Sequence, residues 1–196
     1  MTYKLSKVGQ VILGWTVANF IGVAIIGLLS LIQFLVPIRG MLVSSFIIGF
    51  PIGFAQWLVL RRIAPISVLW VLTISAGLFL GLLVINSPIP IGFLDFLDDE
   101  SVLSLTAAFT TIGIIIGLVQ WLFLRSHFTK SLVWLLSSAV GFGLGIGLVL
   151  ASNLIDQSGL ISAIIVVLVY STATGLALEW LRGHDDHSYN RLPQAT

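Results

Sequence analysis

The stretch Gly49-Phe-Pro-Ile-Gly53-Phe-Ala-Gln56-Trp57-Leu58-Val-Leu60-Arg61 decides the fold, because the chain repeats it. The second copy, 64 residues further on, reads Gly113-Ile-Ile-Ile-Gly117-Leu-Val-Gln120-Trp121-Leu122-Phe-Leu124-Arg125. The match continues past both copies, where Ser67, Trp70, Gly77 and Gly81 correspond to Ser131, Trp134, Gly141 and Gly145. Because the shared residues include Trp, Gln and Arg, an apolar composition alone does not explain them. The pattern predicts internal repeats over residues 49–85 and 113–149 that pack against each other.

Composition indicates a membrane as the solvent. The 196 residues are 58% hydrophobic and 9% charged, with a mean hydropathy of +1.11, whereas about 25% of residues carry charge in soluble domains. Six apolar stretches follow one another, at about 9–36, 41–60, 66–86, 102–124, 131–153 and 159–181. Each holds about 20 residues or more, enough to cross a hydrocarbon core of about 30 Å as a helix. We expect an all-α integral membrane protein, a single domain over 1–196 with six transmembrane helices.

The outer two stretches predict a degenerate third copy of the repeat, assembled from residues 9–36 and 159–182. Trp15 precedes Gly22 by seven residues, as Trp70 precedes Gly77. Near the other end, Glu179-Trp180-Leu181 resembles Gln56-Trp57-Leu58. The expected architecture is therefore three helix hairpins. Two spans per unit give the hairpins the same orientation, so the repeats are parallel rather than inverted.

Basic residues predict the orientation in the membrane. With six spans, eight of the nine Lys and Arg residues share one face with both termini, and only Arg39 lies opposite. They are Lys4, Lys7, Arg61, Arg62, Arg125, Lys130, Arg182 and Arg191. An excess of Lys and Arg marks the cytoplasmic face, and the acidic run Asp95, Asp98, Asp99, Glu100 falls on the other side. We expect a multi-pass protein of a bacterial inner (plasma) or thylakoid membrane, with both termini cytoplasmic.

All six tryptophans occupy equivalent points near the expected cytoplasmic ends of the helices: Trp15, Trp57, Trp70, Trp121, Trp134 and Trp180. Amphipathic rings are common at the level of lipid headgroups, so the primary prediction is six interfacial aromatics. The alternative is that some rings line a vestibule open to the cytoplasm, or a groove for pigment or lipid.

Small residues predict how the helices pack. Glycines recur four residues apart at Gly49/Gly53, Gly77/Gly81, Gly113/Gly117 and Gly141/Gly145. Such pairs let two helix backbones approach closely and gain dispersion contacts. We expect them to act within the chain, with association between copies as the alternative. Pro51, inside the second expected helix, predicts a kink there.

Three polar side chains, Gln56, Gln120 and Glu179, fall at matching positions just inside the cytoplasmic ends. If the hairpins close around an axis, these residues are candidates for a polar ring. The simpler alternative is hydration at the interface, together with an ion pair between Glu179 and Arg182 one helical turn apart.

Several function classes are disfavoured. No charged residue or histidine falls mid-span, which counts against proton relays and ion-coupled carriers. Serines in the spans have no neighbouring base, and the loops are short, so an enzyme is not expected. The chain lacks cysteine, and the tail His184-Asp185-Asp186-His187 has no visible scaffold, so no metal site is expected. A net charge of +1 makes nucleic acid an unsuitable partner.

The joined motifs Gly-x-x-x-Gly-x-x-Gln-Trp-Leu-x-Leu-Arg and Trp-x6-Gly-x-x-x-Gly carry a family resemblance. The chain resembles a group of bacterial multi-pass membrane proteins, common in photosynthetic bacteria, that repeat a Gln-Trp-x-x-Leu-Arg hairpin. The motif residues here are Gln56, Trp57, Leu60 and Arg61, then Gln120, Trp121, Leu124 and Arg125. The third copy departs from it, with Glu179 in place of Gln. The resemblance implies a fold but no established activity, so it assigns no functional residues.

Three functions are compatible with this architecture. The first is a non-enzymatic scaffold, assembly or accessory factor for a membrane complex, which contacts lipids and another membrane protein and needs no cofactor. The second is a passive pore or small-solute transporter with the polar trio at its cytoplasmic mouth. Pigment binding is the third, and it would require Gln56, Gln120 or Glu179 as the ligand.

Overall fold

The computed structural model describes residues 2–35, 40–86, 102–152 and 160–189. All the regular elements in this part of the chain are helical, in the order α1 (Thr2–Leu35), α2 (Met41–Leu60), the short 3₁₀ helix η1 (Val68–Leu72), α3 (Thr73–Ile85), α4 (Val102–Leu124), α5 (Leu132–Ala151) and α6 (Leu160–Tyr189). Arg39, the acidic run Asp95 to Glu100, and Arg191 lie outside the described residues.

Among the described residues, five segments are long and apolar enough to cross a membrane: Leu42–Leu60, Val68–Ile85, Val102–Leu124, Leu132–Ala151 and Ile161–His184. A sixth apolar stretch, Gly9–Ile25, is shorter and lies within α1. The outward surface is also apolar, with Leu13, Leu103 and Leu136 each more than 60% exposed. An outer surface of this kind suits hydrocarbon as the surrounding solvent.

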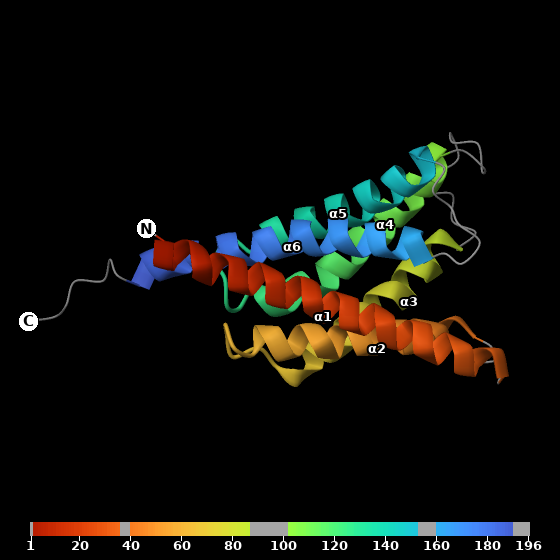
Figure 1. Cartoon of the computed structure of the whole chain (residues 1–196), viewed down its shortest axis with the longest axis horizontal. Coiled ribbons are helices and arrows are strands. Elements are labelled where there is room, and N and C mark those ends of the chain that lie inside the picture. Colours follow the sequence, from red (N-terminus) through yellow and green to blue (C-terminus); the bar gives the residue numbers. More distant parts are fainter. Residues whose placement is uncertain (1, 36–39, 87–101, 153–159, 190–196) are drawn as a thin grey trace, which may run out of the picture.

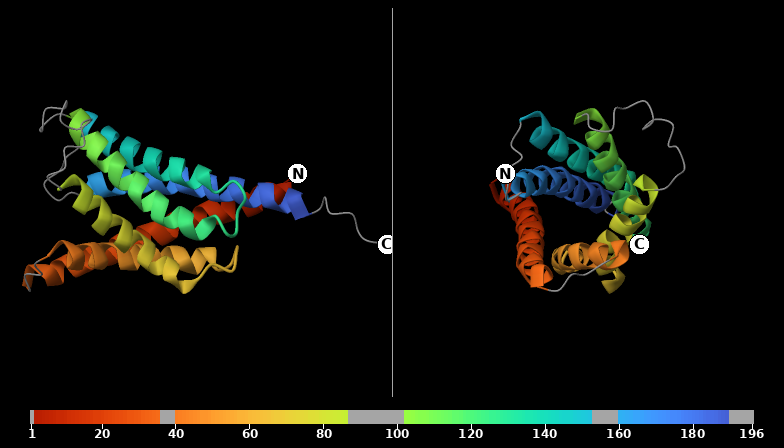
Figure 2. Two further views of the ribbon diagram at one scale, coloured as in Figure 1. Left: turned by 180° about the vertical axis from the view of Figure 1, so that it is seen from behind. Right: turned by 90° about the vertical axis from the view of Figure 1, so that its right-hand side faces the viewer.

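The helices form a single ring in chain order. Each helix packs against the next one, and α6 closes the ring by packing against α1. The end-on view in Figure 2 shows this circular arrangement. In Figure 1, α1 begins and α6 ends at the same end of the bundle, where the α2–α3 and α4–α5 turns also lie. We call this the basic end, because its residues include Arg61, Arg62, Arg125, Lys130 and Arg182.

The helix ends follow local chemistry, with one departure from expectation. Gly40 precedes α2 with φ of 123°, a left-handed conformation that glycine adopts without steric cost. Helix α2 runs through Pro51 without interruption. The span expected from residue 66 starts as the 3₁₀ turn η1, where the Ser67 hydroxyl accepts a hydrogen bond from the Leu69 backbone N–H at 3.3 Å. The matching span instead enters α5 directly after Ser131.

Each predicted glycine pair faces the next helix in the ring. The pair Gly49/Gly53 meets the backbone of α3 and η1, and Gly77/Gly81 meets α4 at Ile116 and Ile112. Further round, Gly113/Gly117 meets α5, and Gly141/Gly145 meets α6. Two single glycines complete the circle: Gly22 of α1 faces Ile52 of α2, and Gly175 of α6 faces Trp15 of α1. A Cβ atom added at Gly77 would lie 2.7 Å from the Ile116 Cα, so this helix pair depends on the absence of a side chain.

Candidate functional site

The most distinctive site is a buried group of polar and aromatic side chains near the basic end. We call it the central cluster and define it as Trp15, Asn19, Gln56, Trp70, Gln120, Trp134 and Thr174. Its members come from α1, α2, η1, α4, α5 and α6, so they meet inside the ring rather than between two neighbouring helices. The three Trp side chains and both Gln side chains are 0% exposed.

Each of the three cluster tryptophans donates its indole N–H to a side chain on the preceding helix of the ring. Trp70 Nε1 donates to Gln56 Oε1 at 3.3 Å, and Trp134 Nε1 donates to Gln120 Oε1 at 2.9 Å. Across the α6–α1 closure, Trp15 Nε1 donates to the Thr174 hydroxyl at 2.9 Å. The first two bonds are equivalent in the repeat, because both residues of the second lie 64 positions after those of the first. The third makes the same type of contact with a different acceptor.

Amide side chains connect these three contacts into one network. Gln120 Nε2 donates to Gln56 Oε1 at 3.2 Å, and Gln56 Nε2 donates to Asn19 Oδ1 at 2.9 Å. Asn19 Nδ2 in turn donates to the Trp15 carbonyl at 2.9 Å. Gln56 Oε1 therefore accepts from two donors, and Gln56 is the member with the most partners. A buried network with its groups paired avoids the cost of about 1–3 kcal/mol for each polar group left unsatisfied.

Aromatic contacts fill the space around the amides. The Trp134 ring packs edge-on against Trp15, with centroids 5.4 Å apart, and against Trp70, with centroids 5.9 Å apart. Leu60, Leu124 and Leu178 lie in the same hydrophobic core and are 0% exposed. Together these side chains occupy the interior of the ring at the level of the amides.

The other three tryptophans lie at the periphery and form a separate set. Arg61 lies over the Trp57 ring at 4.9 Å from its centroid, Arg125 over Trp121 at 5.4 Å, and Lys130 over Trp180 at 5.5 Å. The six tryptophans expected at the interface thus divide into a peripheral trio with basic partners and a buried trio. The prediction of six interfacial aromatics therefore needs correction for Trp15, Trp70 and Trp134, because these three side chains are 0% exposed.

The polar ring also has a different third member from the one expected. Gln56 and Gln120 are hydrogen-bonded to each other, but Glu179 takes no part in the network. Its Oε2 lies 3.8 Å from the Arg182 guanidinium, and its side chain is 19% exposed, which is the ion-pair alternative. Thr174, five residues earlier, is the side chain that a cluster tryptophan reaches. The register follows because Ile52, Ile116 and Tyr170 are the residues that face Gly22, Gly77 and Gly141, and Gln56, Gln120 and Thr174 come four residues after them.

Sequence reasoning missed Asn19 and Thr174 as members of the site. Asn19 follows Trp15 by one helical turn, which was a usable signal for a shared face. For Thr174, the alignment of Trp180 with Trp57 and Trp121 misled the register. Leu178 would have corrected it, since it is the residue that takes the buried position of Leu60 and Leu124.

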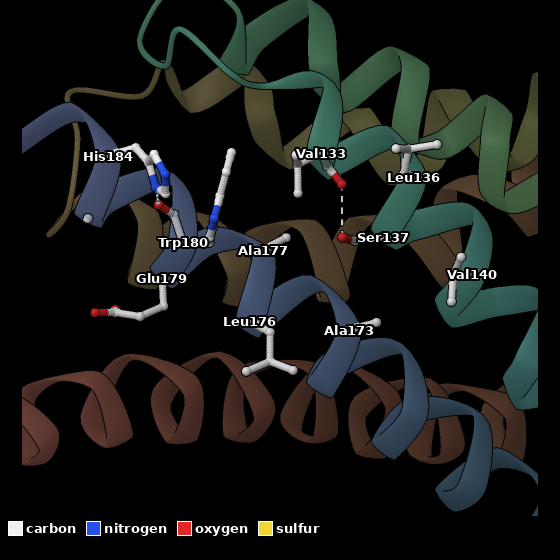
Figure 3. A pocket seen from close by; sticks show the side chains of 11 residues that line it. Val133, Leu136, Ser137, Val140, Ala173, Leu176, Ala177, Glu179, Trp180 and His184 are labelled. Atoms are coloured by element: carbon white, nitrogen blue, oxygen red, sulfur yellow. Dashed lines mark hydrogen bonds between the residues drawn. The ribbon is translucent and has the colours of Figure 1, made fainter. Parts of the chain in front are cut away.

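The described residues also form an interior cavity and two outer grooves. An apolar cavity of about 310 Å³ lies inside the ring, next to the central cluster on the side away from the basic end. Two open grooves lie on the outside, one of about 850 Å³ between α5 and α6 (Figure 3) and one of about 610 Å³ between α1 and α2. Within the same residues, no group of three or more His, Cys, Asp or Glu side chains comes together.

The five described segments that are able to cross a membrane place the chain in the class of multi-pass helical membrane proteins. Comparison with protein-family models, curated proteins and solved structures finds no significant match that would add to this class.

Proposed function

We propose that the chain is a six-span protein of three co-oriented helix hairpins that serves, without enzymatic activity, as a scaffold, assembly or accessory factor of a membrane complex. The sixth span is α1, whose 34 residues exceed the length needed to cross the hydrocarbon core. The shared position of the α2–α3 turn, the α4–α5 turn and the outer ends of α1 and α6 supports the even number of spans (Figure 1).

The observation that carries this proposal is that the central cluster fills the interior of the ring near the basic end. A passive pore needs a continuous path wide enough for water, lined by groups that replace the solute's hydration. In this bundle the two glutamines expected at a pore mouth bond to each other and to buried tryptophans. Their side chains are 0% exposed, so they offer a passing solute no hydrogen bonds. We therefore favour the scaffold or accessory role over the passive pore.

The groove between α5 and α6 is the outer surface best suited to a partner. Its sides include the exposed Leu136 and Val140 of α5, and its α6 side carries the half-buried Ala173 (Figure 3). A small side chain in such a groove lets another helix approach closely in lipid. The occupant that fits this surface is a transmembrane helix of another membrane protein, with Trp180 and His184 at the basic end of the contact.

Site-specific crosslinking in native membranes tests the partner-binding role. A photoreactive amino acid at Leu136, inside the groove, is expected to give one discrete heavier species. The control is the same amino acid at Leu144, which is equally accessible on α5 and does not line the groove. Equal crosslinking at both positions, or none above the lipid background, contradicts the role.

A flux assay tests the passive-pore alternative. Proteoliposomes with the purified chain are expected to leak small neutral solutes no faster than protein-free vesicles, and faster leakage favours the pore.

The proposed topology has a separate test, because the chain contains no cysteine. Single variants Arg61→Cys and Arg125→Cys should both react with a membrane-impermeant reagent from the cytoplasmic side. Reaction from opposite sides rules out co-oriented repeats.

A further inference from the structure

The outer groove between α1 and α2 has apolar walls on both sides. Its α1 side includes Val17, Ile21 and Ile25, its α2 side includes Phe50 and Phe54, and all five are at least 39% exposed. The Phe50 and Phe54 rings are nearly parallel, at an interplanar angle of 9°, and their centroids lie 6.4 Å apart. The two rings form a continuous apolar wall along α2.

The groove starts near the basic end and runs toward the middle of the bundle. At about 1.5 Å per residue, the part of α1 that lines it, from Gly14 to Ile25, covers about 16 Å. One leaflet of a membrane supplies about 15 Å of hydrocarbon, which is half of a core of about 30 Å. The groove is therefore about as long as the leaflet on the side of the basic end is deep.

Arg62 lines the groove at its basic end and is exposed. In the described part of the chain it forms no ion pair, whereas Arg182 is paired with Glu179. The neighbouring Arg61 lies over the Trp57 ring. A guanidinium without a carboxylate partner, next to an apolar groove, attracts an anion that is attached to an apolar chain.

The groove between α5 and α6 occupies the equivalent place in the ring but has different chemistry. Gln56 and Thr174 hold equivalent places in the central cluster, and Arg62 and Trp180 each come six residues later. The α5–α6 groove thus has an indole where the α1–α2 groove has a cation, and it also carries the carboxylate of Glu179. The cation therefore distinguishes the α1–α2 groove from its counterpart.

We propose that the α1–α2 groove binds one anionic phospholipid. One acyl chain lies between the α1 and α2 walls, and the lipid phosphate pairs with the Arg62 guanidinium, whose planar fork matches two phosphate oxygens. Any lipid can lie against an apolar wall, so the specific claim is a preference for an anionic over a zwitterionic headgroup. This inference goes beyond the partner-binding role, which concerns the α5–α6 groove, and failure of one leaves the other standing.

The test uses the full chain in phosphatidylcholine nanodiscs with a trace of a photoreactive lipid that carries a diazirine on one acyl chain. Two probes differ only in the headgroup, which is phosphatidylglycerol or phosphatidylcholine. After irradiation, mass spectrometry should locate the label on groove residues such as Val17, Ile21 and Phe54. The phosphatidylglycerol probe should label them about fivefold more, as expected for one basic residue near an anionic headgroup. Equal labelling by the two probes overturns the proposal.

Arg62→Gln isolates the charged contact. This variant should lose the preference for the phosphatidylglycerol probe and keep the weaker labelling by the phosphatidylcholine probe. Arg125→Gln is the matched control, because it removes an exposed arginine from the same end of the bundle that does not line the groove. It should retain the preference. Equal losses in the two variants would show a general effect of charge at the basic end and would contradict a site in this groove.

Gly14→Phe tests the apolar part of the site. Gly14 lines the groove, and a Cβ added there meets no atom within 4 Å, so the new ring should fill the groove and reduce its labelling by both probes. Gly9→Phe is the control on the same helix, because Gly9 is equally open but does not line the groove. Unchanged labelling in Gly14→Phe contradicts the proposal. If Gly14→Phe does not fold, the comparison of Arg62 with Arg125 still decides it.

Excess glycerol phosphate distinguishes a lipid from a free anion as the ligand. It should leave labelling by the phosphatidylglycerol probe unchanged, because the acyl chain holds the lipid in the groove. Displacement of the probe would show that the headgroup binds without the chain, which contradicts the proposed site.

Discussion

The two halves of the bundle are built on opposite principles. Toward the basic end, indole rings, amides and a hydroxyl form a hydrogen-bonded cluster that fills the interior of the ring. Beyond it, the interior is aliphatic, with Ile74, Ile112 and Ile116 as its buried core, and it leaves a cavity. Figure 1 shows α1 and α2 sloping away from α4 and α5 in this second half.

The difference shows what specifies helix pairing in lipid. Aliphatic side chains gain little by leaving hydrocarbon for a protein interior, so they do not select one partner over another. Hydrogen bonds and close backbone contacts do, because both require particular residues opposite each other. The cluster half contains both devices, whereas the aliphatic half relies on the glycines. The following substitutions test this contrast, in descending order of expected effect.

Gln56→Leu is expected to have the largest effect, because Gln56 has partners on three other helices. The change removes the acceptor of Trp70 and Gln120 and the donor to Asn19. With about 1–3 kcal/mol for each group left unsatisfied, the loss in the free energy of unfolding should be about 3 kcal/mol or more. Unfolding by increasing SDS in mixed micelles measures this loss. Gln10→Leu, at an exposed position of α1, is the matched control and should change little.

Gly77→Ala is expected to have the next largest effect and tests the second device. The new methyl group would lie 2.7 Å from the Ile116 Cα, which forces α3 and α4 apart. Overpacking of this kind costs about 1–3 kcal/mol. The control is Gly14→Ala, where an added Cβ meets no atom within 4 Å. There, higher helix propensity should raise stability, by up to about 1 kcal/mol. Effects of the same sign at both positions would contradict a packing role for Gly77.

The helical and membrane-spanning character of the chain was predictable from its sequence. Long apolar stretches specify helices by backbone chemistry alone, since a chain in lipid must satisfy its hydrogen bonds internally. All-helical structure and several membrane-spanning segments were therefore predictable. In the structure, the glycines of the predicted pairs lie where neighbouring helices approach closely. The glycine spacing could not say which helix each face would meet, because one spacing serves any neighbour.

Depth and side-chain partners were the parts that sequence could not supply. Trp57 and Trp70 both lie near the basic end of the bundle. Trp57 contacts Arg61, whereas Trp70 is buried among the amides. The direction of a side chain around its helix decides between these outcomes. Trp70 reaches the amides from η1 and Trp134 reaches them from the first turn of α5, and the 3₁₀ turn was not predicted. In α6, the polar residue in register with the glutamines is a threonine, which no motif identified.

Thr174→Val tests the assignment of Thr174 to the cluster with a smaller expected effect. Valine keeps the shape of threonine but removes the acceptor of the Trp15 indole. Polar contacts between membrane helices average about 0.6 kcal/mol and reach about 1.7 kcal/mol, so a loss of about 1 kcal/mol is expected. Thr172→Val, on the exposed side of the same helix, is the control. If Glu179→Gln destabilises the chain more than Thr174→Val does, the register proposed for α6 is wrong.

Replacing the peripheral tryptophans should have the smallest effect on stability and gives the sharpest spectroscopic contrast. The variant with Trp57, Trp121 and Trp180 changed to Phe loses three peripheral rings and their cation–π contacts, worth about 0.5–1 kcal/mol each at exposed sites. It also loses the hydrogen bond from Trp57 Nε1 to the Ile66 carbonyl. Brominated lipids quench indole fluorescence on contact. The wild-type chain should be quenched substantially, whereas this variant retains only the buried trio and should be quenched little. Trp134→Phe is the converse control. It removes a buried ring, so lipid should quench a larger fraction of its fluorescence than in the wild-type chain. Equal quenching of the triple variant and the wild-type chain would show that lipid reaches the interior of the ring, and the contrast between the two sets of tryptophans would not hold.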